Sequence, residues 1–269
     1  MIDPHPEHHP VALRRLAQVG LTARGAIYLT IGVLAVLAAL GQGGATTGPH
    51  GALRELFSQP FGSAILASLA LGLLAYATWR MIDAVRDLSG KGNGAKGIAI
   101  RTGKAGSALL HLAWAVGAIS LLIGSGGGGS DDAAAQGWTA RLLDQPSGRW
   151  LLAAVAIGLG VFALDHFRRA WKASFLKHVD RERMSHRAQE WLLAIGRCGL
   201  SARGLTLGIA AGFLLLAAWQ HDPSQARGLS GSLDAVWEQP FGPALLGLVA
   251  TGVAAFGVYN VMLARWYEQ

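Results

Sequence analysis

The chain has 269 residues, of which 52% are hydrophobic and only 14% are charged. An average soluble domain carries about 25% charged residues, so this composition argues against a protein that meets only water. The net charge of +7 is spread over short segments between apolar blocks. This pattern argues against nucleic acid as a partner and favours a lipid bilayer with anionic headgroups.

Residues 1–19 are polar and rich in Pro and His, without the basic and then apolar plan of a cleaved signal peptide. We therefore predict a cytoplasmic polar tail and expect the first apolar block to remain as a span. His5, His8 and His9 are too weak a pattern to predict a metal site. Cys198 is the only cysteine, so an internal disulfide is excluded.

Six runs with few charges are long enough to cross about 30 Å of hydrocarbon as α-helices. They are dominated by Ala, Leu and Gly without period-two alternation, which predicts an all-α membrane protein and argues against β-strands. The fourth run is the shortest and must include Asp165 and His166 to reach across. The predicted spans are residues 20–40, 61–81, 105–124, 150–167, 199–219 and 241–264.

The 23 Lys and Arg residues divide unevenly between alternate connections. Nearly all lie on the side that would hold both ends of the chain, which the positive-inside rule assigns to the cytoplasm. We therefore expect a multi-pass protein with both termini cytoplasmic. The opposite connections hold only Arg54, Arg141, Arg149 and Arg227.

An internal repeat divides the chain into tandem units. GLTARG from Gly20 recurs as GLSARG from Gly199, and each opens a span. A second marker, LFSQPFG ending at Gly62, recurs as VWEQPFG ending at Gly242. Each Gln-Pro pair is expected in the first turn of the following span, where proline has no bonded N–H to lose.

The middle copy of the repeat is degenerate, with GKAGSA from Gly103 and LLDQPSG ending at Gly148. Short amphipathic stretches before each Gln-Pro pair predict surface helices, so each unit is a span, a surface helix and a second span. Two crossings return the chain to its starting side, so the three units share one orientation and are compatible with a pseudo-three-fold bundle.

These features define the predicted organisation of the chain. The segment FLKHVDRERMSHRAQEW alternates charged and apolar residues, which predicts a cytoplasmic helix along the membrane face, with a solvated connector as the alternative. We predict a tail at 1–19, repeat one at 20–90, repeat two at 91–174, a cytoplasmic amphipathic connector at 175–195 and repeat three at 196–269.

Four segments carry a resemblance to a known family: ARGAIYLTIGVLAV, GALRELFSQPFG, TARLLDQPSGRWLL and EQPFGPALLGLVATGVAAFGVYN. They resemble the bacterial membrane family known as domain of unknown function 1206, over nearly the whole chain. The resemblance implies the fold and the bacterial inner (plasma) membrane, and it implies no activity. The middle copy departs from the pattern because Ser107 stands where the other copies have Arg24 and Arg203.

Ionisable residues inside a span cost free energy, so each is a candidate for function. His111 lies deepest, about 12 Å into the third span. We expect it to bond a neighbouring helix or to take part in proton relay or ligand contact. Arg24 and Arg203 lie about a turn inside their spans, where they are expected to reach the headgroups as anchors or to contact a substrate or a lipid phosphate.

Two carboxylates close their spans on the cytoplasmic side. Asp83 ends the second span and Asp165 the fourth, at a depth where each is expected to pair with Arg24 or Arg203. His166 follows Asp165 directly, but adjacent residues on a helix do not face each other, which argues against a titrating pair.

The sequence contains no metal-ligand spacing, no nucleophile elbow and no cofactor motif, which weakens an enzyme without excluding one. The first functional hypothesis is a small-solute or ion transporter or channel with a midplane site at His111. The alternative is a non-enzymatic scaffold that docks another membrane protein, and a homo-oligomer stays open. A polar cavity at His111 would favour transport, and a closed apolar centre would favour the scaffold.

Overall fold

The protein is described by a computed structural model covering residues 11–125, 129–179 and 184–267. Six helices of the described residues are long and apolar enough to cross a membrane, which confirms the six predicted spans and the all-α class. These are α1 (Val11–Ala39), α3 (Gly62–Arg86), α4 (Ala95–Leu122), α6 (Gly148–Lys172), α7 (His186–Gln220) and α9 (Gly242–Arg265). Between them lie α2 (Pro49–Ser58), α5 (Asp131–Leu143), α8 (Leu229–Trp237) and the short 3-10 helices η1 (Ser174–His178) and η2 (Pro223–Gln225).

Three helices begin about nine or more residues earlier than expected, and these are α1, α4 and α7. Helix α1 begins at Val11, inside the predicted tail, because Leu13 and Ala17 already bury a face of the helix. The three histidines of the tail lie outside the described residues. Helix α7 begins at His186, where the Ser185 side chain accepts a hydrogen bond from the Ala188 N–H. The prediction of one surface helix over residues 175–191 is therefore wrong, since the described part divides between η1 and α7.

The Gln-Pro motifs form turns between helices. The prediction that they lie in the first turn of the following span is therefore wrong. Helix α2 ends at Ser58, and α3 begins only at Gly62, after Phe61 has adopted a left-handed conformation with φ of 61°. The Gly62 N–H donates to the Gln59 carbonyl at 2.8 Å. A Cβ at Gly62 would overlap the Phe57 carbonyl, and Gly148 meets a carbonyl in the same way, which explains the glycine after each motif.

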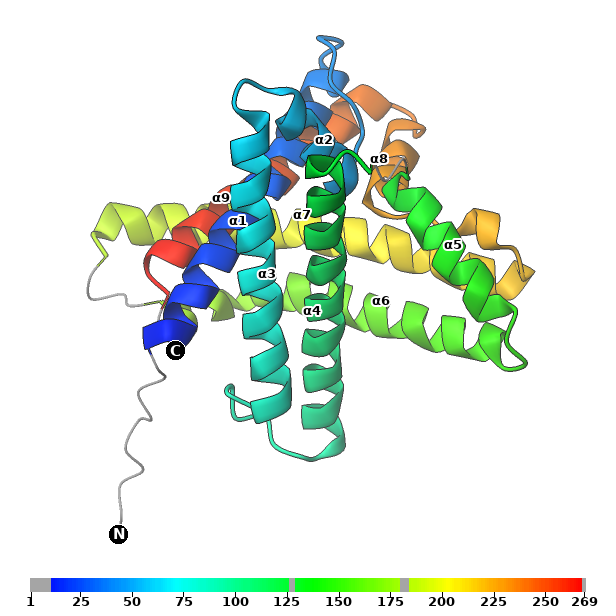
Figure 1. Ribbon diagram of the computed structural model, residues 1–269, viewed down its shortest axis with the longest axis horizontal. Coiled ribbons are helices and arrows are strands. Elements are labelled where there is room, and N and C mark those ends of the chain that lie inside the picture. The colour runs from blue at the N-terminus through cyan, green and yellow to red at the C-terminus, as the bar shows by residue number, and fades with distance from the viewer. Residues whose placement is uncertain (1–10, 126–128, 180–183, 268–269) are drawn as a thin grey trace.

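The three repeats form a ring in which each repeat contacts the next through one pair of long helices. The closest pairs are α3 with α4, α6 with α7, and α9 with α1, so the second span of each repeat packs on the first span of the next. Figure 1 shows these three pairs running in different directions. Within repeats, α1 contacts α3 and α7 contacts α9, whereas α4 and α6 scarcely touch.

Glycine crossings hold α9 against α1 and close the ring. The carbonyl of Gly257 lies 2.7 Å from the position of a Cβ on Gly25, and a Cβ on Gly257 would overlap the backbone of Leu29. A Cβ on Gly32 would overlap the backbone of Ala254. Such close approach of backbones needs small residues, and it is the usual way to pack helices where lipid removes the hydrophobic drive.

The helices α2, α5 and α8 lie at one end of the bundle, here called the surface-helix end. Hydrogen bonds connect them to one another. Asp131 at the start of α5 accepts from His50 Nδ1 on α2 at 2.9 Å, and this bond raises the pKa of His50. Asp132 accepts from the Gly231 N–H at 3.2 Å and the Ser230 hydroxyl at 3.1 Å at the start of α8. Adjacent carboxylates on α5 thus join all three repeats.

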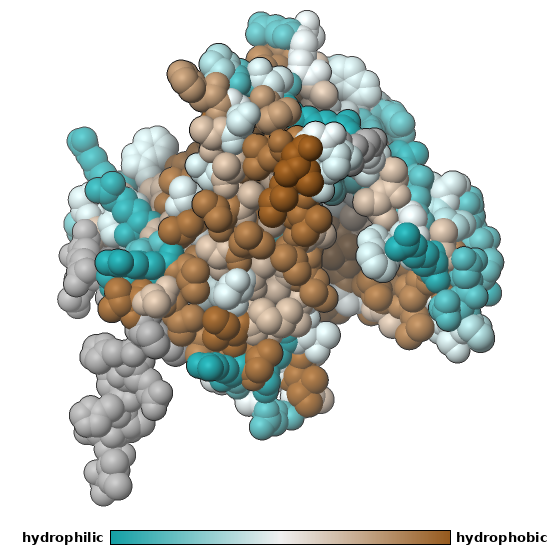
Figure 2. Space-filling model, in the orientation of Figure 1, coloured by the Kyte–Doolittle hydropathy of each residue, from teal (hydrophilic) through white to brown (hydrophobic). Residues whose placement is uncertain are grey.

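The surface of the molecule agrees with a bilayer environment. Figure 2 shows hydrophobic residues over the middle of the visible face and hydrophilic residues gathered towards its ends. The opposite end from the surface helices, here called the basic end, carries the start of α1 and the end of α9. There Val179 after η1 pairs with Tyr267 after α9.

The close crossing predicts the effect of one methyl group. Gly257→Ala should lower the free energy of unfolding by about 2 kcal/mol, because the added Cβ must separate α9 from α1. Gly212→Ala in α7 is the control, since a Cβ there meets open space and its stability should not fall. Thermal unfolding of the purified variants in detergent measures both, and equal melting temperatures would contradict the crossing.

Candidate functional site

One cluster of polar and aromatic side chains lies where the three repeats meet, and it is here called the central cluster. Every repeat contributes to it. Its members are Arg24 and Tyr28 from α1, Tyr76 from α3, His111 from α4, Arg203 from α7 and Phe256 from α9.

The repeat itself brings these side chains together. Arg24 and Tyr28 are four residues apart and share one face of α1, and Ser107 and His111 occupy the same positions in the second repeat. Gly20 lies directly on the backbone of Tyr76, with 2.6 Å between a built Cβ and the Tyr76 Cα. The small residue lets the Tyr76 ring reach the centre of the bundle.

Arg24 is held by aromatic rings and not by a carboxylate. Its Nη1 donates to the Tyr76 hydroxyl at 2.9 Å, and its Cζ lies 4.9 Å from the centre of the Phe256 ring. The centres of the Tyr76 and Tyr28 rings follow at 5.3 and 5.6 Å. The expected pairing with Asp83 or Asp165 does not occur, and the Nε atom is buried without a hydrogen-bond partner.

Arg203 repeats this arrangement from α7. Its Cζ lies 4.9 Å from the centre of the same Tyr28 ring, and its Nε is also buried without a partner. Two cations therefore share one aromatic ring, and neither forms an ion pair with a carboxylate of the described residues. Both residues stay partly exposed while their Nε atoms are buried, so their role as headgroup anchors or as contacts of a substrate or lipid phosphate stays a prediction.

His111 lies inside the cluster with 2% of its surface exposed. Its Nδ1 donates to the carbonyl of Ser107 at 2.7 Å, so its bond is made within α4 and not to a neighbouring helix. Its ring lies 4.3 Å from that of Tyr76 and 4.5 Å from that of Trp114. Nε2 is buried and unpartnered, as is the Tyr28 hydroxyl.

The two neighbours on α6 separate, as the sequence indicated. His166 is buried, with Nδ1 donating to the Phe162 carbonyl at 2.9 Å and its ring 6.4 Å from Phe256. Asp165 turns outward, with 40% of its side chain exposed and Arg168 at 3.7 Å. His166 thus borders the central cluster, and Asp165 lies outside it.

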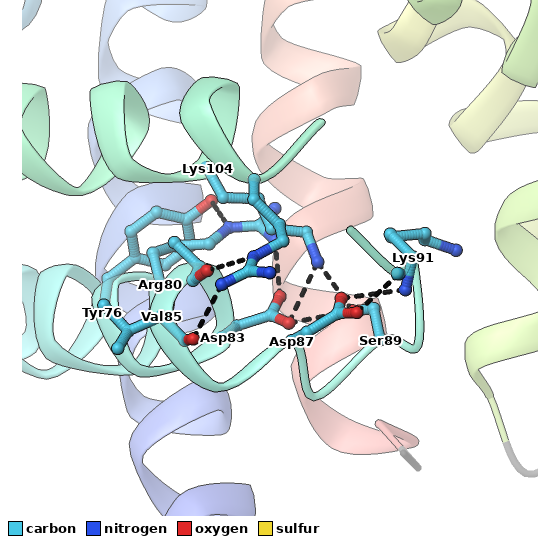
Figure 3. Close-up of polar contacts among 11 residues, drawn as sticks. Tyr76, Arg80, Asp83, Val85, Asp87, Ser89, Lys91 and Lys104 are labelled. Atoms are coloured by element: carbon cyan, nitrogen blue, oxygen red, sulfur yellow. Dashed lines mark hydrogen bonds and ion pairs between the residues drawn. The ribbon is translucent and has the colours of Figure 1, made fainter. Parts of the chain in front are cut away.

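Asp83 anchors a separate polar network at the basic end of α3 (Figure 3). Lys104 Nζ donates to its carboxylate at 2.9 Å and to the Ser89 hydroxyl at 2.7 Å, and Arg80 Nη1 lies at 3.7 Å. Arg80 Nε also donates to the Tyr76 hydroxyl at 3.1 Å, which connects the network to the cluster. The buried carboxylate of Asp83 therefore has cations beside it, whereas Arg24 and Arg203 have no carboxylate beside them among the described residues.

Sequence reasoning missed the aromatic half of the site. Tyr76, Phe162 and Phe256 stand at the same position after the Gln-Pro motif in the three repeats. Aligning the repeats at Gly62, Gly148 and Gly242 would have revealed this ring position. The partners Lys104 and Arg80 of Asp83 were missed because they depend on how α4 packs on α3.

Two cavities lie elsewhere, towards the surface-helix end. One, of about 370 Å³, lies between α5 and the segment from η2 to the end of α8, and its lining includes Asp132, Arg227 and Glu238. The other, of about 230 Å³, lies beside His50 and the far half of α4. Neither reaches His111, around which aromatic side chains are packed.

The fold and the cluster define a multi-span membrane protein built from three tandem repeats around a shared centre. The family model described as Domain of Unknown Function (DUF1206) matches residues 19–87, 102–173 and 198–267. Because these segments cover more than half of the chain, the protein belongs to this family. The resemblance stated from the sequence motifs is thereby confirmed, and so is the division into three repeats.

A relative from Bacillus subtilis (strain 168) carries the name "Uncharacterized protein YxxB". It is 33% identical over 250 residues, which cover 93% of this chain and 90% of the relative. No solved structure matches the chain. The comparisons thus give a family described as of unknown function and an uncharacterized relative from a bacterium.

Asp83 and Asp165 each lie three residues from an arginine on the same helix, but we expect their substitution to affect stability to different extents. Asp83→Asn should lower the free energy of unfolding by about 3 kcal/mol, because Lys104 and Arg80 lose a buried counter-charge. Asp165→Asn should change it by less than about 1 kcal/mol, since that pair is solvent-exposed. Thermal unfolding in detergent compares the two, and equal losses would show that the Asp83 network is not a stabilising unit.

Proposed function

We propose that this membrane protein binds an oxyanion at the central cluster and conveys it across the bilayer. The observation that supports this is the pair Arg24 and Arg203, two cations from different repeats that meet at one tyrosine ring without a carboxylate among the described residues. Buried ionisable groups inside membrane bundles commonly mark solute pathways.

The balance of free energies at the two arginines favours the binding of a negatively charged ligand. A guanidinium on an aromatic face gains about 0.5 to 2 kcal/mol, whereas desolvation of an ion in a protein costs several kcal/mol even after relaxation. The rings therefore leave Arg24 and Arg203 incompletely compensated, and two like charges near one ring repel each other. An oxyanion would supply the charge, and guanidinium groups suit carboxylate and phosphate because their donors form a planar fork.

The unpartnered atoms give the site its recognition chemistry. The Nε donors of Arg24 and Arg203 and the Tyr28 hydroxyl are all buried without partners. With its Nδ1 proton directed to Ser107, a neutral His111 offers Nε2 as an acceptor, which suits a protonated oxygen of the ligand. Together these atoms provide donors for an anion and one acceptor for its proton.

The direction of the protein in the membrane is part of the proposal. The basic end faces the cytoplasm, because nearly all Lys and Arg residues of the connections lie there. Thiol labels at cysteines placed in residues 1–10 and at Gln269, in a Cys198→Ser background, should both be reached only from the cytoplasmic side. Labels that react from opposite sides would contradict an even number of spans.

A scaffold is the second candidate, and the packing at His111 favours it. The ring is enclosed by Tyr76 and Trp114, and the two cavities described above lie away from it. A protein that only holds another membrane protein needs no central cavity. Stoichiometric co-purification of one partner in mild detergent, together with loss of that partner's assembly when this chain is deleted, would support the scaffold.

The arginine pair provides the test of anion binding. The variant Arg24→Gln/Arg203→Gln should lose about tenfold or more in affinity for acetate and phosphate, measured by titration calorimetry, and should lose saturable uptake into proteoliposomes. Its melting temperature without ligand should not fall, because neither arginine forms an ion pair with a carboxylate of the described residues. Arg197→Gln is the control, since Arg197 is an exposed residue of the same helix. Equal anion binding by the double variant would refute the proposal.

A further inference from the structure

The two spans of the first and third repeats are locked together by equivalent contacts. In repeat one, Gly20 lies on Tyr76, and Gly72 lies on the Cβ of Ala23. In repeat three, Gly199 lies on Phe256, and Gly252 packs on Ala202 in the same way. The two outer repeats thus use the same small-residue crossing to pack span on span.

The middle repeat keeps the glycines of this crossing but not the contact. Gly103 corresponds to Gly20, and Gly158 corresponds to Gly72. A Cβ added at Gly103, Gly106 or Gly158 meets nothing within 4 Å. Helices α4 and α6 scarcely touch, and they are the least buried of the six candidate spans.

The exposed fractions of equivalent side chains show the same separation. In the middle repeat Leu110 is 46% exposed, Val155 55% and Phe162 42%. The equivalent residues of the other repeats are at most 7% exposed, and these are Ile27, Thr206, Leu69, Val249, Tyr76 and Phe256. The space between α4 and α6 is here called the α4–α6 groove, lined by Gly103, Gly106, Leu110, Val155, Gly158 and Phe162.

The inner wall of the groove borders the central cluster. Behind Phe162 lies His166, 4.6 Å from its ring, and then Phe256, on which Arg24 rests. On the other wall, His111 follows Leu110 on α4 and faces Tyr76. Figure 1 shows α4 and α6 running at a steep angle to each other, unlike the paired helices α3 with α4 and α6 with α7.

We infer that the α4–α6 groove admits the hydrocarbon chain of an anionic amphiphile from the bilayer, whose oxyanion head reaches Arg24 and Arg203. This inference rests on the proposed function, since it names the class of oxyanion that the central cluster binds. The groove residues are apolar and would face lipid chains, so hydrocarbon from the bilayer is the natural occupant. The charge at its inner end then selects an anionic head over a neutral or cationic one.

A small water-soluble anion lacks the hydrocarbon chain that would occupy the groove. Its affinity depends on the arginines alone and is therefore lower than that of an anionic amphiphile. A fatty acid or an anionic lipid keeps its chain in an apolar environment throughout. The glycines at 103, 106 and 158 leave room for that chain because they add no side chain to the groove.

The test uses a palmitate with a diazirine near the middle of its chain and the full-length protein in neutral phosphatidylcholine nanodiscs. After photolysis, the labelled peptides should come mainly from residues 95–122 and 148–172. Gly158→Leu should reduce this labelling about tenfold, since the side chain fills the groove. Gly212→Leu is the matched control, because Gly212 is also exposed in open space on a long helix and should label as the wild type does.

Competition and the arginine variant separate the possible outcomes. Unlabelled palmitate should prevent labelling, whereas hexadecanol, acetate and phosphate at the same concentration should not. Arg24→Gln/Arg203→Gln should reduce labelling to the level of Gly158→Leu. Uniform labelling of all lipid-facing helices, or unchanged labelling of Gly158→Leu, would overturn the groove inference. The proposed function would still stand in that case if acetate binding depended on the two arginines. Labelling and acetate binding that both ignore the arginines would overturn both.

Discussion

The close crossing of α9 and α1 is the constraint on which the centre of this molecule depends. Gly25 and Gly257 bring the last helix onto the first, which closes the ring of repeats. Arg24 and Tyr28 lie on one of these helices and Phe256 on the other, and the rings of Tyr28 and Phe256 are 5.0 Å apart. A wider crossing would remove Phe256 from the Arg24 guanidinium, and the arginine would lose the ring at which it is held most closely.

Charge is treated in two different ways along the bundle. At the basic end of α3, the buried carboxylate of Asp83 has both Lys104 and Arg80 beside it, so cation and anion compensate each other. In the central cluster, Arg24 and Arg203 have only aromatic faces and one tyrosine hydroxyl. The compensated charges lie on α3 and α4, whereas the two arginines come from α1 and α7 and meet no carboxylate of the described residues. An arrangement that needs an external anion is more readily explained by ligand binding than by stability.

The sequence predicted the fold because its signals are local or repetitive. Apolar length alone defines the six spans, and the recurrence of GLTARG and QPFG defines the three units. The partners of Arg24 could not be predicted in this way, because they depend on which helix of another repeat packs beside α1. The depth of Arg24 and Arg203 was also misjudged: span ends were taken from charged residues, whereas α1 and α7 continue well beyond them. The bent Gln-Pro turn was missed because proline suits both a first helical turn and a tight turn.

The degenerate middle repeat explains how a three-fold plan can produce a site with one entrance. A third arginine in place of Ser107 would bring another cation to the same rings, and mutual repulsion in a low dielectric would grow with each added charge. Ser107 instead brings no charge, and His111 one turn further along α4 contributes its ring to the cluster, with Nδ1 donating to the main-chain carbonyl of residue 107. The same repeat leaves its two spans apart, with Phe162 exposed where Tyr76 and Phe256 are buried. Loss of symmetry in charge and loss of contact between spans therefore coincide in one unit, which places the least cationic wall of the cluster beside the lipid-facing groove.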